Sequence, residues 1–238
     1  KKIISDFELS KFIVCTDAGL ASEDNRKFND KEGRAFITTQ SIKKLKAHLK
    51  KWALDTEGWK LSGSTKTYDI SKLDEMMDQA TPEEKTKIIS KVFYKERWIK
   101  ENNFEQRLIV TYSIKYRDYQ RNIRNAQIER AQKIIENNPT KIKKCNANDY
   151  KRFIHKTSYT PDGEIAEKEK YSIDQAIIQK EEAFDGFYGV CTNLEDAVSE
   201  IIKVNHRRWE IEECFRIMKS QFKARPVYLS NDDMIEAH

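Results

Sequence analysis

The chain has 238 residues, a formal charge of +5 at pH 7 and a charged fraction of 35%. No apolar stretch approaches the roughly 18 residues that a membrane-spanning helix needs, and no secretion signal is visible, which favours a cytoplasmic protein. The mild basicity fits a protein that handles DNA, although most of the charges cancel.

The first predicted element is a short apolar strand at residues 11–16 that ends in an acid, Asp17. A Gly-containing turn and the polar start of a helix follow it. A carboxylate at the end of a core strand is well situated to face a ligand at the rim of the sheet, so Asp17 is a candidate metal ligand. The alternative is a turn or cap residue, because Asp before Ala-Gly is common in turns.

A second core strand is predicted at residues 34–39, followed by a helix over residues 41–55. Thr81-Pro-Glu-Glu84 is a strong helix start, since it combines an N-cap residue, a proline in the first turn and the Glu of a capping box. Apolar residues at helical spacing predict that this helix continues to Phe93.

The next predicted elements are a strand at residues 108–114, a long polar helix at 115–137, a hairpin of 152–157 with 165–171 around Pro161-Asp-Gly163, and a strand at 186–192. Basic residues outnumber acidic ones from Lys115 to Lys144, and three tyrosines stand near its start: Tyr112, Tyr116 and Tyr119. Such a segment suits a phosphate backbone, with tyrosines that stack on unpaired bases. A solvated helix face is the alternative, and no single residue is assigned a DNA contact here.

The last predicted helix contains the most informative pattern in the chain. At 100° per residue, Arg208, Glu212 and Lys219 lie on one stripe, which suits an acid that holds a metal and cations that hold phosphates. The neighbouring apolar stripe, which we expect to anchor the helix in a core, comprises Ile211, Phe215 and Met218. The alternative is a solvated helix face with a common i,i+4 ion pair.

The four cysteines have no short spacing that indicates a zinc site. Because they lie in apolar or amphipathic segments, we expect buried free thiols at Cys15, Cys191 and Cys214. Cys145 is the fourth cysteine.

The string from Asn205 to Lys219 closely resembles the Tyr-x2-Arg-x3-Glu-x6-Lys motif of DDE transposases of the insertion sequence four type. Arg208, Glu212 and Lys219 match the Arg, Glu and Lys of that motif, and Asn205 stands at the Tyr position. Other segments that look like this family are residues 185–188, 192–193, 208–213 and 224–228.

The resemblance implies an α/β (α+β) protein with an RNase H-like, retroviral integrase-like catalytic core. It implies that residues 1–55 and 183–238 belong to this core, and that residues 56–182 form a mixed helix and strand insertion subdomain. It is specific over residues 8–40 and 184–238, and individual residues of the insertion are not aligned.

In that family, Asp17 looks like the second Asp of the catalytic triad and Glu212 like its Glu, and both would bind Mg²⁺, with Mn²⁺ as a substitute. Two such ions promote in-line displacement at phosphorus, as in DNA cleavage and strand transfer. Arg208, Lys219 and Asn205 would contact transposon-end DNA. The implied partners are transposon-end and target DNA, bound by a homodimer.

The first Asp of the triad is expected on an earlier strand, but only sixteen residues precede Asp17. We therefore expect an internal fragment with little or no activity in isolation. One alternative is a truncated, inactive transposase that binds DNA or intact transposase and inhibits it. Another is an RNase H-like nuclease with the same metal chemistry but without strand transfer.

Overall fold

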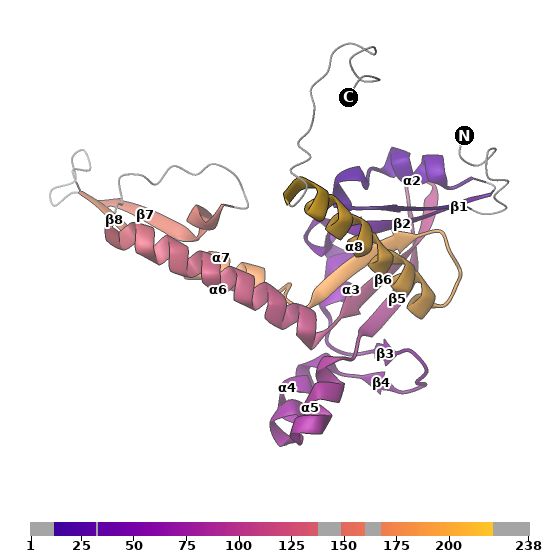
Figure 1. Cartoon of the computed structure of the whole chain (residues 1–238), viewed down its shortest axis with the longest axis horizontal. Helices are drawn as coiled ribbons and strands as arrows, with labels where there is room; N and C mark the ends of the chain where they lie inside the picture. The colour runs from indigo at the N-terminus through magenta and orange to yellow at the C-terminus, as the bar shows by residue number, and fades with distance from the viewer. Residues whose placement is uncertain (1–11, 32, 138–148, 160–167, 221–238) are drawn as a thin grey trace, which may run out of the picture.

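The structure, a computed structural model, describes residues 12–31, 33–137, 149–159 and 168–220. Its main element is a mixed seven-stranded sheet in the order β1-β2-β9-β6-β5-β3-β4 (Figure 1). β1 and β2 are parallel, and all other neighbouring strands in this sheet are antiparallel. The strands are β1 (Phe12–Thr16), β2 (Arg34–Gln40), β3 (Trp59–Leu61), β4 (Thr67–Tyr68), β5 (Phe93–Glu101), β6 (Phe104–Tyr112) and β9 (Phe187–Thr192).

The two faces of the sheet pack into separate cores, because successive side chains of a strand point to opposite faces. The larger core contains Phe36, Leu108 and Val110 and is completed by Trp59 and by Leu49 of α3. The smaller core contains Ile37, Ile109 and Val190, and α8 crosses it with Val198 and Ile201 (Figure 1). The helices around the sheet are α2 (Glu23–Asn29), α3 (Ala47–Leu54), α4 (Leu73–Gln79), α5 (Pro82–Ile89) and α8 (Val198–Ser220). Short 3-10 turns are η1 (Ala18–Leu20), η2 (Ile42–Lys44) and η3 (Ile70–Lys72).

A second unit, which we call the arm, projects from the sheet (Figure 1). It consists of α6 (Ile114–Asn137), η5 (Tyr150–Phe153), β7 (Ile154–Tyr159), β8 (Lys168–Ile173) and α7 (Gln175–Glu182). The arm has its own small core of Ala131, Phe153, Ile154 and Ile178. A buried ion pair between Arg124 Nη1 and Asp185 Oδ1, 2.7 Å apart, joins α6 to the turn before β9.

The coarse prediction of a mixed helix and strand protein is confirmed, as are several of its elements. The capping box at Thr81 is present, with Thr81 N–H donating to Glu84 Oε2 at 2.9 Å. The strand at 34–39 and the long helix at 115–137 correspond to β2 and α6. The prediction that the Thr81 helix continues to Phe93 was wrong: α5 ends at Ile89, and Phe93 begins β5, where it pairs with Tyr112.

The residues predicted as an insertion, 56–182, contribute β3 to β6 to the main sheet and supply most of the arm. The predicted hairpin is present as the antiparallel pair β7 and β8. Its turn at Pro161–Gly163, residues 224–228 and Cys145 lie outside the described residues. No helix in the described ranges is long and apolar enough to cross a membrane.

Candidate functional site

Asp17 follows β1 directly and caps the short turn η1. Its Oδ1 accepts hydrogen bonds from Gly19 N at 2.9 Å and from Leu20 N at 3.1 Å. The alternative interpretation of Asp17 as a turn or cap residue is therefore confirmed. Only one carboxylate oxygen, Oδ1, makes the capping bonds. Both bonds described for this exposed side chain use Oδ1, which leaves Oδ2 for a further ligand.

Helix α8 begins at the end of the sheet where strand β1 begins and runs toward the end where β1 ends. The starting point follows from the pairing, because β9 is antiparallel to β2 and α8 starts shortly after β9. The direction follows from Arg208, whose charge acts on Cys15 near the end of β1. By Arg208 the helix has reached Cys15, the next-to-last residue of β1. Burial raises the pKa of the Cys15 thiol, and the nearby charge of Arg208 lowers it.

The same geometry brings the backbone of Glu212 toward Asp17. Glu212 follows Arg208 by one helical turn, about 6 Å along the axis, and Asp17 follows Cys15 by two residues, roughly 7 Å along the strand direction. Both steps lead to the same end of the sheet, the end where β1 ends. The side chains of Glu212 and Lys219 lie outside the described part of the structure.

Two predictions for the end of α8 were wrong. Met218 is 48% exposed and does not anchor the helix in a core, and Cys214 is exposed although a buried thiol was expected. The last turns of α8 extend past the sheet, so none of its described strands covers these side chains (Figure 1). An ion pair between Glu213 and Arg216 lies on the same solvated segment. The prediction for Cys191 is confirmed, since its thiol is buried and free.

Asp17 fits a hard divalent cation. Mg²⁺ prefers oxygen ligands, retains several waters and is commonly bound by one or two carboxylates together with substrate phosphates. Oδ2 of Asp17 is an oxygen of the type that Mg²⁺ prefers, and Glu212 is on the helix that runs toward the same end of the sheet. Within the described ranges, no group of three His, Cys, Asp or Glu side chains is arranged to hold a metal.

A groove that sequence reasoning missed lies beside this edge, between α8, α6 and the sheet. It has a volume of about 540 Å³, and we call it the tyrosine groove. The residues that define it are Lys115, Tyr116, Tyr119, Tyr188, Asn205 and His206. Tyr116 stacks with Tyr119 at a centroid distance of 6.3 Å, and it meets Tyr188 edge to face at 6.1 Å.

Asn205 gives this groove a polar end. Its side chain is only 6% exposed, and its Nδ2 donates to the Tyr188 hydroxyl at 3.4 Å. Its Oδ1 is buried and has no hydrogen-bond partner among the described residues. A buried acceptor without a donor carries a desolvation cost, and this oxygen is too deeply buried to face a ligand in the groove. Burial raises the pKa of Tyr116, and the neighbouring Tyr188 and Tyr119 raise it further, so its hydroxyl stays protonated.

The basic segment at residues 115–144 is only partly available to a phosphate backbone. Arg117 is buried against Asp74, with Nη1 and Oδ1 2.7 Å apart, and Arg124 is buried against Asp185. Tyr112, expected to be available for stacking on bases, is instead 6% exposed in the larger core. The exposed cations on α6 are Lys115, Arg121, Arg130 and Lys133.

Comparison of the chain with protein-family models, with curated proteins and with solved structures finds no match. The resemblance to DDE transposases therefore depends on the residues of the chain itself. The order of residues 205–219 and the position of Asp17 carry it.

Proposed function

We propose that this chain is part of a DDE transposase of the insertion sequence four type, an enzyme that cleaves and joins DNA ends with Mg²⁺ or Mn²⁺. The observation that carries the proposal is the course of α8 over β1. It brings Arg208 beside Cys15 and directs the turn that contains Glu212 toward the edge occupied by Asp17.

In this function Asp17 and Glu212 hold the metal through carboxylate oxygens. The bound metal neutralises charge on the phosphate and activates the attacking oxygen. The backbone N–H groups of Gly19 and Leu20 orient the Asp17 carboxylate through Oδ1, which directs Oδ2 to a ligand. Arg208 and Lys219 are on the same helix as Glu212. They bind phosphates of the DNA backbone, because positive charge attracts these phosphates.

The topology supports an RNase H-like core at one end of the sheet. β1 and β2 form the only parallel pair among the described strands, and α8 packs on this part of the sheet. The antiparallel strands β6, β5, β3 and β4, which we assign to the insertion, extend the sheet beyond β9. We assign the arm to the same insertion, and we propose that the protein works in the cytoplasm as a homodimer on DNA.

The tyrosine groove supports nucleic acid as the substrate. An aromatic face of Tyr116 or Tyr188 can stack on an unpaired base, an interaction worth about 1–3 kcal/mol per base. Asn205 is buried at the end of the groove, where its Nδ2 donates to the Tyr188 hydroxyl and so helps to hold that ring.

A second candidate function is a DNA-binding protein that does not cut. The groove favours it, because stacking of a base on a tyrosine ring requires no metal. Such a protein would bind element ends or intact transposase and inhibit transposition.

Metal titration separates these functions. Mn²⁺ affinity is measured calorimetrically in the presence of a DNA duplex that has a single-stranded 3′ end, for the native chain and for Asp17→Asn, Glu212→Gln and Glu213→Gln. We expect the first two variants to weaken Mn²⁺ binding by about ten-fold or more. Glu213→Gln is the matched control, because this exposed neighbour pairs with Arg216.

Unchanged Mn²⁺ affinity in both Asp17→Asn and Glu212→Gln would rule out the metal-ligand roles. DNA binding that persists in chelator, with no Mn²⁺ bound by the native chain, would favour the second candidate. In a longer chain that includes the strand expected to carry the first Asp, Glu212→Gln should abolish cleavage and leave end binding intact. Lys219→Ala should weaken DNA binding and lower its salt slope by about one.

A further inference from the structure

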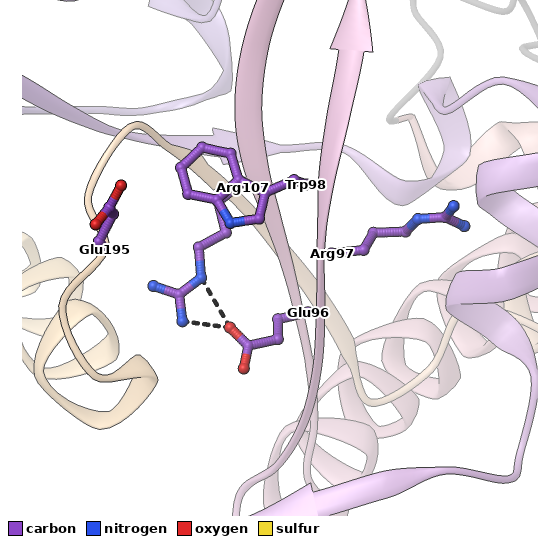
Figure 2. A pocket seen from close by; sticks show the side chains of 5 residues that line it. All are labelled: Glu96, Arg97, Trp98, Arg107 and Glu195. Atoms are coloured by element: carbon purple, nitrogen blue, oxygen red, sulfur yellow. Dashed lines mark hydrogen bonds and ion pairs between the residues drawn. The ribbon is translucent and has the colours of Figure 1, made fainter.

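A second hollow lies at the opposite ends of the strands from Asp17. We call it the tryptophan hollow; it has a volume of about 400 Å³, and its wall includes Glu96, Trp98, Arg107 and Glu195. β5 is antiparallel to β6, and β6 has the direction of β1, so the end of β5 lies where β1 begins. Figure 2 shows Trp98, Arg107 and Glu96 on one side of the strands, with Glu195 across from them on the loop before α8.

Arg107 is a structural part of this wall and is already occupied. Its Nε donates to Glu96 Oε2 at 2.7 Å, and its Nη2 also bonds to this carboxylate. Its Nη1 donates to the backbone oxygens of Leu194 at 3.2 Å and Asp196 at 2.7 Å. All three nitrogens of the guanidinium are therefore engaged, so Arg107 does not supply a site for phosphate or another anion.

Trp98 and Glu195 are the groups that remain open to a ligand. Trp98 is 45% exposed, which is unusual for a large aromatic side chain in the middle of a long strand. Glu195 is exposed beside it. Arg97 points to the other side of the strand, where its guanidinium lies 5.3 Å from the ring centre of Trp52 (Figure 2). The open wall thus combines an indole face with a carboxylate.

We propose that the tryptophan hollow binds an arginine side chain of a partner polypeptide. A planar guanidinium stacks favourably on an indole and can donate hydrogen bonds to a carboxylate at the same time. Trp98 supplies the stacking face and Glu195 the carboxylate. The Arg107–Glu96 pair contributes no net charge, and the guanidinium of Arg97, which also lines the hollow, lies on the other side of the strand against Trp52. On the side of Trp98 the remaining charge is therefore the negative one of Glu195, which complements a cation.

The charges favour a protein partner over nucleic acid. A base stacked on Trp98 would bring its phosphates toward Glu195, and no cation of the wall is open to neutralise them, because Arg107 is engaged and Arg97 points away. Arginine and tryptophan are also the residue types most enriched at the energetic centres of protein interfaces. The site is independent of the proposed transposase activity, since it lies at the other ends of the strands from Asp17.

The test is a titration of the ¹⁵N-labelled chain with N-acetyl-arginine amide, followed through the indole N–H signals of its four tryptophans. Trp98→Phe assigns the Trp98 signal. We expect a saturable shift of this signal, whereas the N–H of Trp59, which donates to Asp55 O at 2.8 Å, stays in place. N-acetyl-citrulline amide has the same shape without the charge and should give no such shift.

Glu195→Gln should weaken binding of the arginine probe by about two- to five-fold. Glu136→Gln on the arm is the matched control, because it removes an exposed carboxylate far from the hollow, and it should leave the affinity unchanged. The proposal is overturned if Trp98 does not respond, if citrulline shifts it equally, or if Glu195→Gln has no effect. Tighter binding of a single-stranded oligothymidylate at Trp98 would also overturn it in favour of base stacking.

Discussion

The thiol of Cys15, whose pKa is raised by burial, lies close enough to Arg208 for the guanidinium to lower that pKa in part. The two residues are far apart in the sequence, one near the end of β1 and the other in the middle of α8. Their proximity relates the strand that precedes Asp17 to the helix that contains Glu212. It is the relationship on which the proposed metal site depends.

The tyrosine groove predicts a specific loss of affinity for unpaired bases. Tyr116→Leu removes a ring that lies between Tyr119 and Tyr188. Since stacking contributes about 1–3 kcal/mol per base, affinity for single-stranded DNA should fall by roughly five-fold or more. Fluorescence anisotropy with a labelled oligonucleotide measures this change.

Tyr171→Leu is the control for that experiment, because this tyrosine lies on β8 of the arm, away from the groove. Equal losses in both variants would show that the groove has no special role. Asn205→Ala tests the polar end separately. It should lower the affinity for single-stranded DNA less than Tyr116→Leu does, because Asn205 is buried and contacts Tyr188 rather than the ligand.

The ion pair of Arg124 and Asp185 predicts a large effect on stability. Both side chains are 5% exposed, and removing one partner from a buried pair typically costs about 3–5 kcal/mol. The cost here should lie at the lower end, because Asp185 Oδ2 also lies 3.5 Å from Arg121 Nε. Arg124→Met should therefore lower the free energy of unfolding strongly, as measured by urea denaturation. The double variant Arg124→Met, Asp185→Leu should recover part of this loss.

The exposed pair of Glu213 and Arg216 provides the comparison. Replacing Arg216 by Met should change the free energy of unfolding by less than about 1 kcal/mol, because solvent screens exposed pairs. A small effect of Arg124→Met alone would contradict the structural role of the buried pair.

Local signals in the sequence were sufficient for some elements and misleading for others. The capping box at Thr81 predicts a helix start because it depends only on neighbouring residues. The end of the same helix was mispredicted, because Ile88, Val92 and Phe93 also fit helical spacing. Phe93 belongs to β5 through its pairing with Tyr112, a contact that no local pattern records.

The candidate site likewise combines features that local patterns predict with features that they do not. The position of Asp17 after a strand and the helix that contains Glu212 could be predicted, since each depends on a short motif. The tyrosine groove could not, because Tyr116, Tyr188 and Asn205 come from three separate elements. Tyr112 belongs to the same run of tyrosines as Tyr116, yet it packs in the core against Trp59 at 6.0 Å.

Gly186 should tolerate no side chain. Its φ is +85°, and an added Cβ would lie 2.6 Å from Cε2 of the buried Tyr112 ring. Gly186→Ala should therefore lower the free energy of unfolding by about 1–3 kcal/mol more than the cost of its backbone angle alone. Gly63→Ala supplies that reference, because Gly63 has a φ of +76° with no atom within 4 Å of an added Cβ. Equal destabilisation of the two variants in thermal unfolding would rule out the clash.

Because of the buried thiol of Cys191, the free energy of unfolding should fall at alkaline pH. Burial raises the pKa of its thiol from 9.0 to about 11. The unfolded chain therefore loses this proton at lower pH than the folded chain, so the stabilisation is complete below pH 9 and is lost as the pH rises through 11. Such a difference corresponds to about 3 kcal/mol. Urea denaturation at several pH values should give a flatter profile for Cys191→Ala than for the native chain.

Cys214→Ala is the matched control for this profile, because Cys214 is exposed on α8. It should leave the dependence of stability on pH unchanged between pH 9 and 11. Iodoacetamide labelling of the native protein should modify Cys214 readily and Cys191 only after unfolding, because the thiolate is the reactive form and Cys191 has no access to solvent. Rapid labelling of Cys191 in the native protein, or a profile of Cys191→Ala as steep as that of the native chain, would contradict its burial in the sheet.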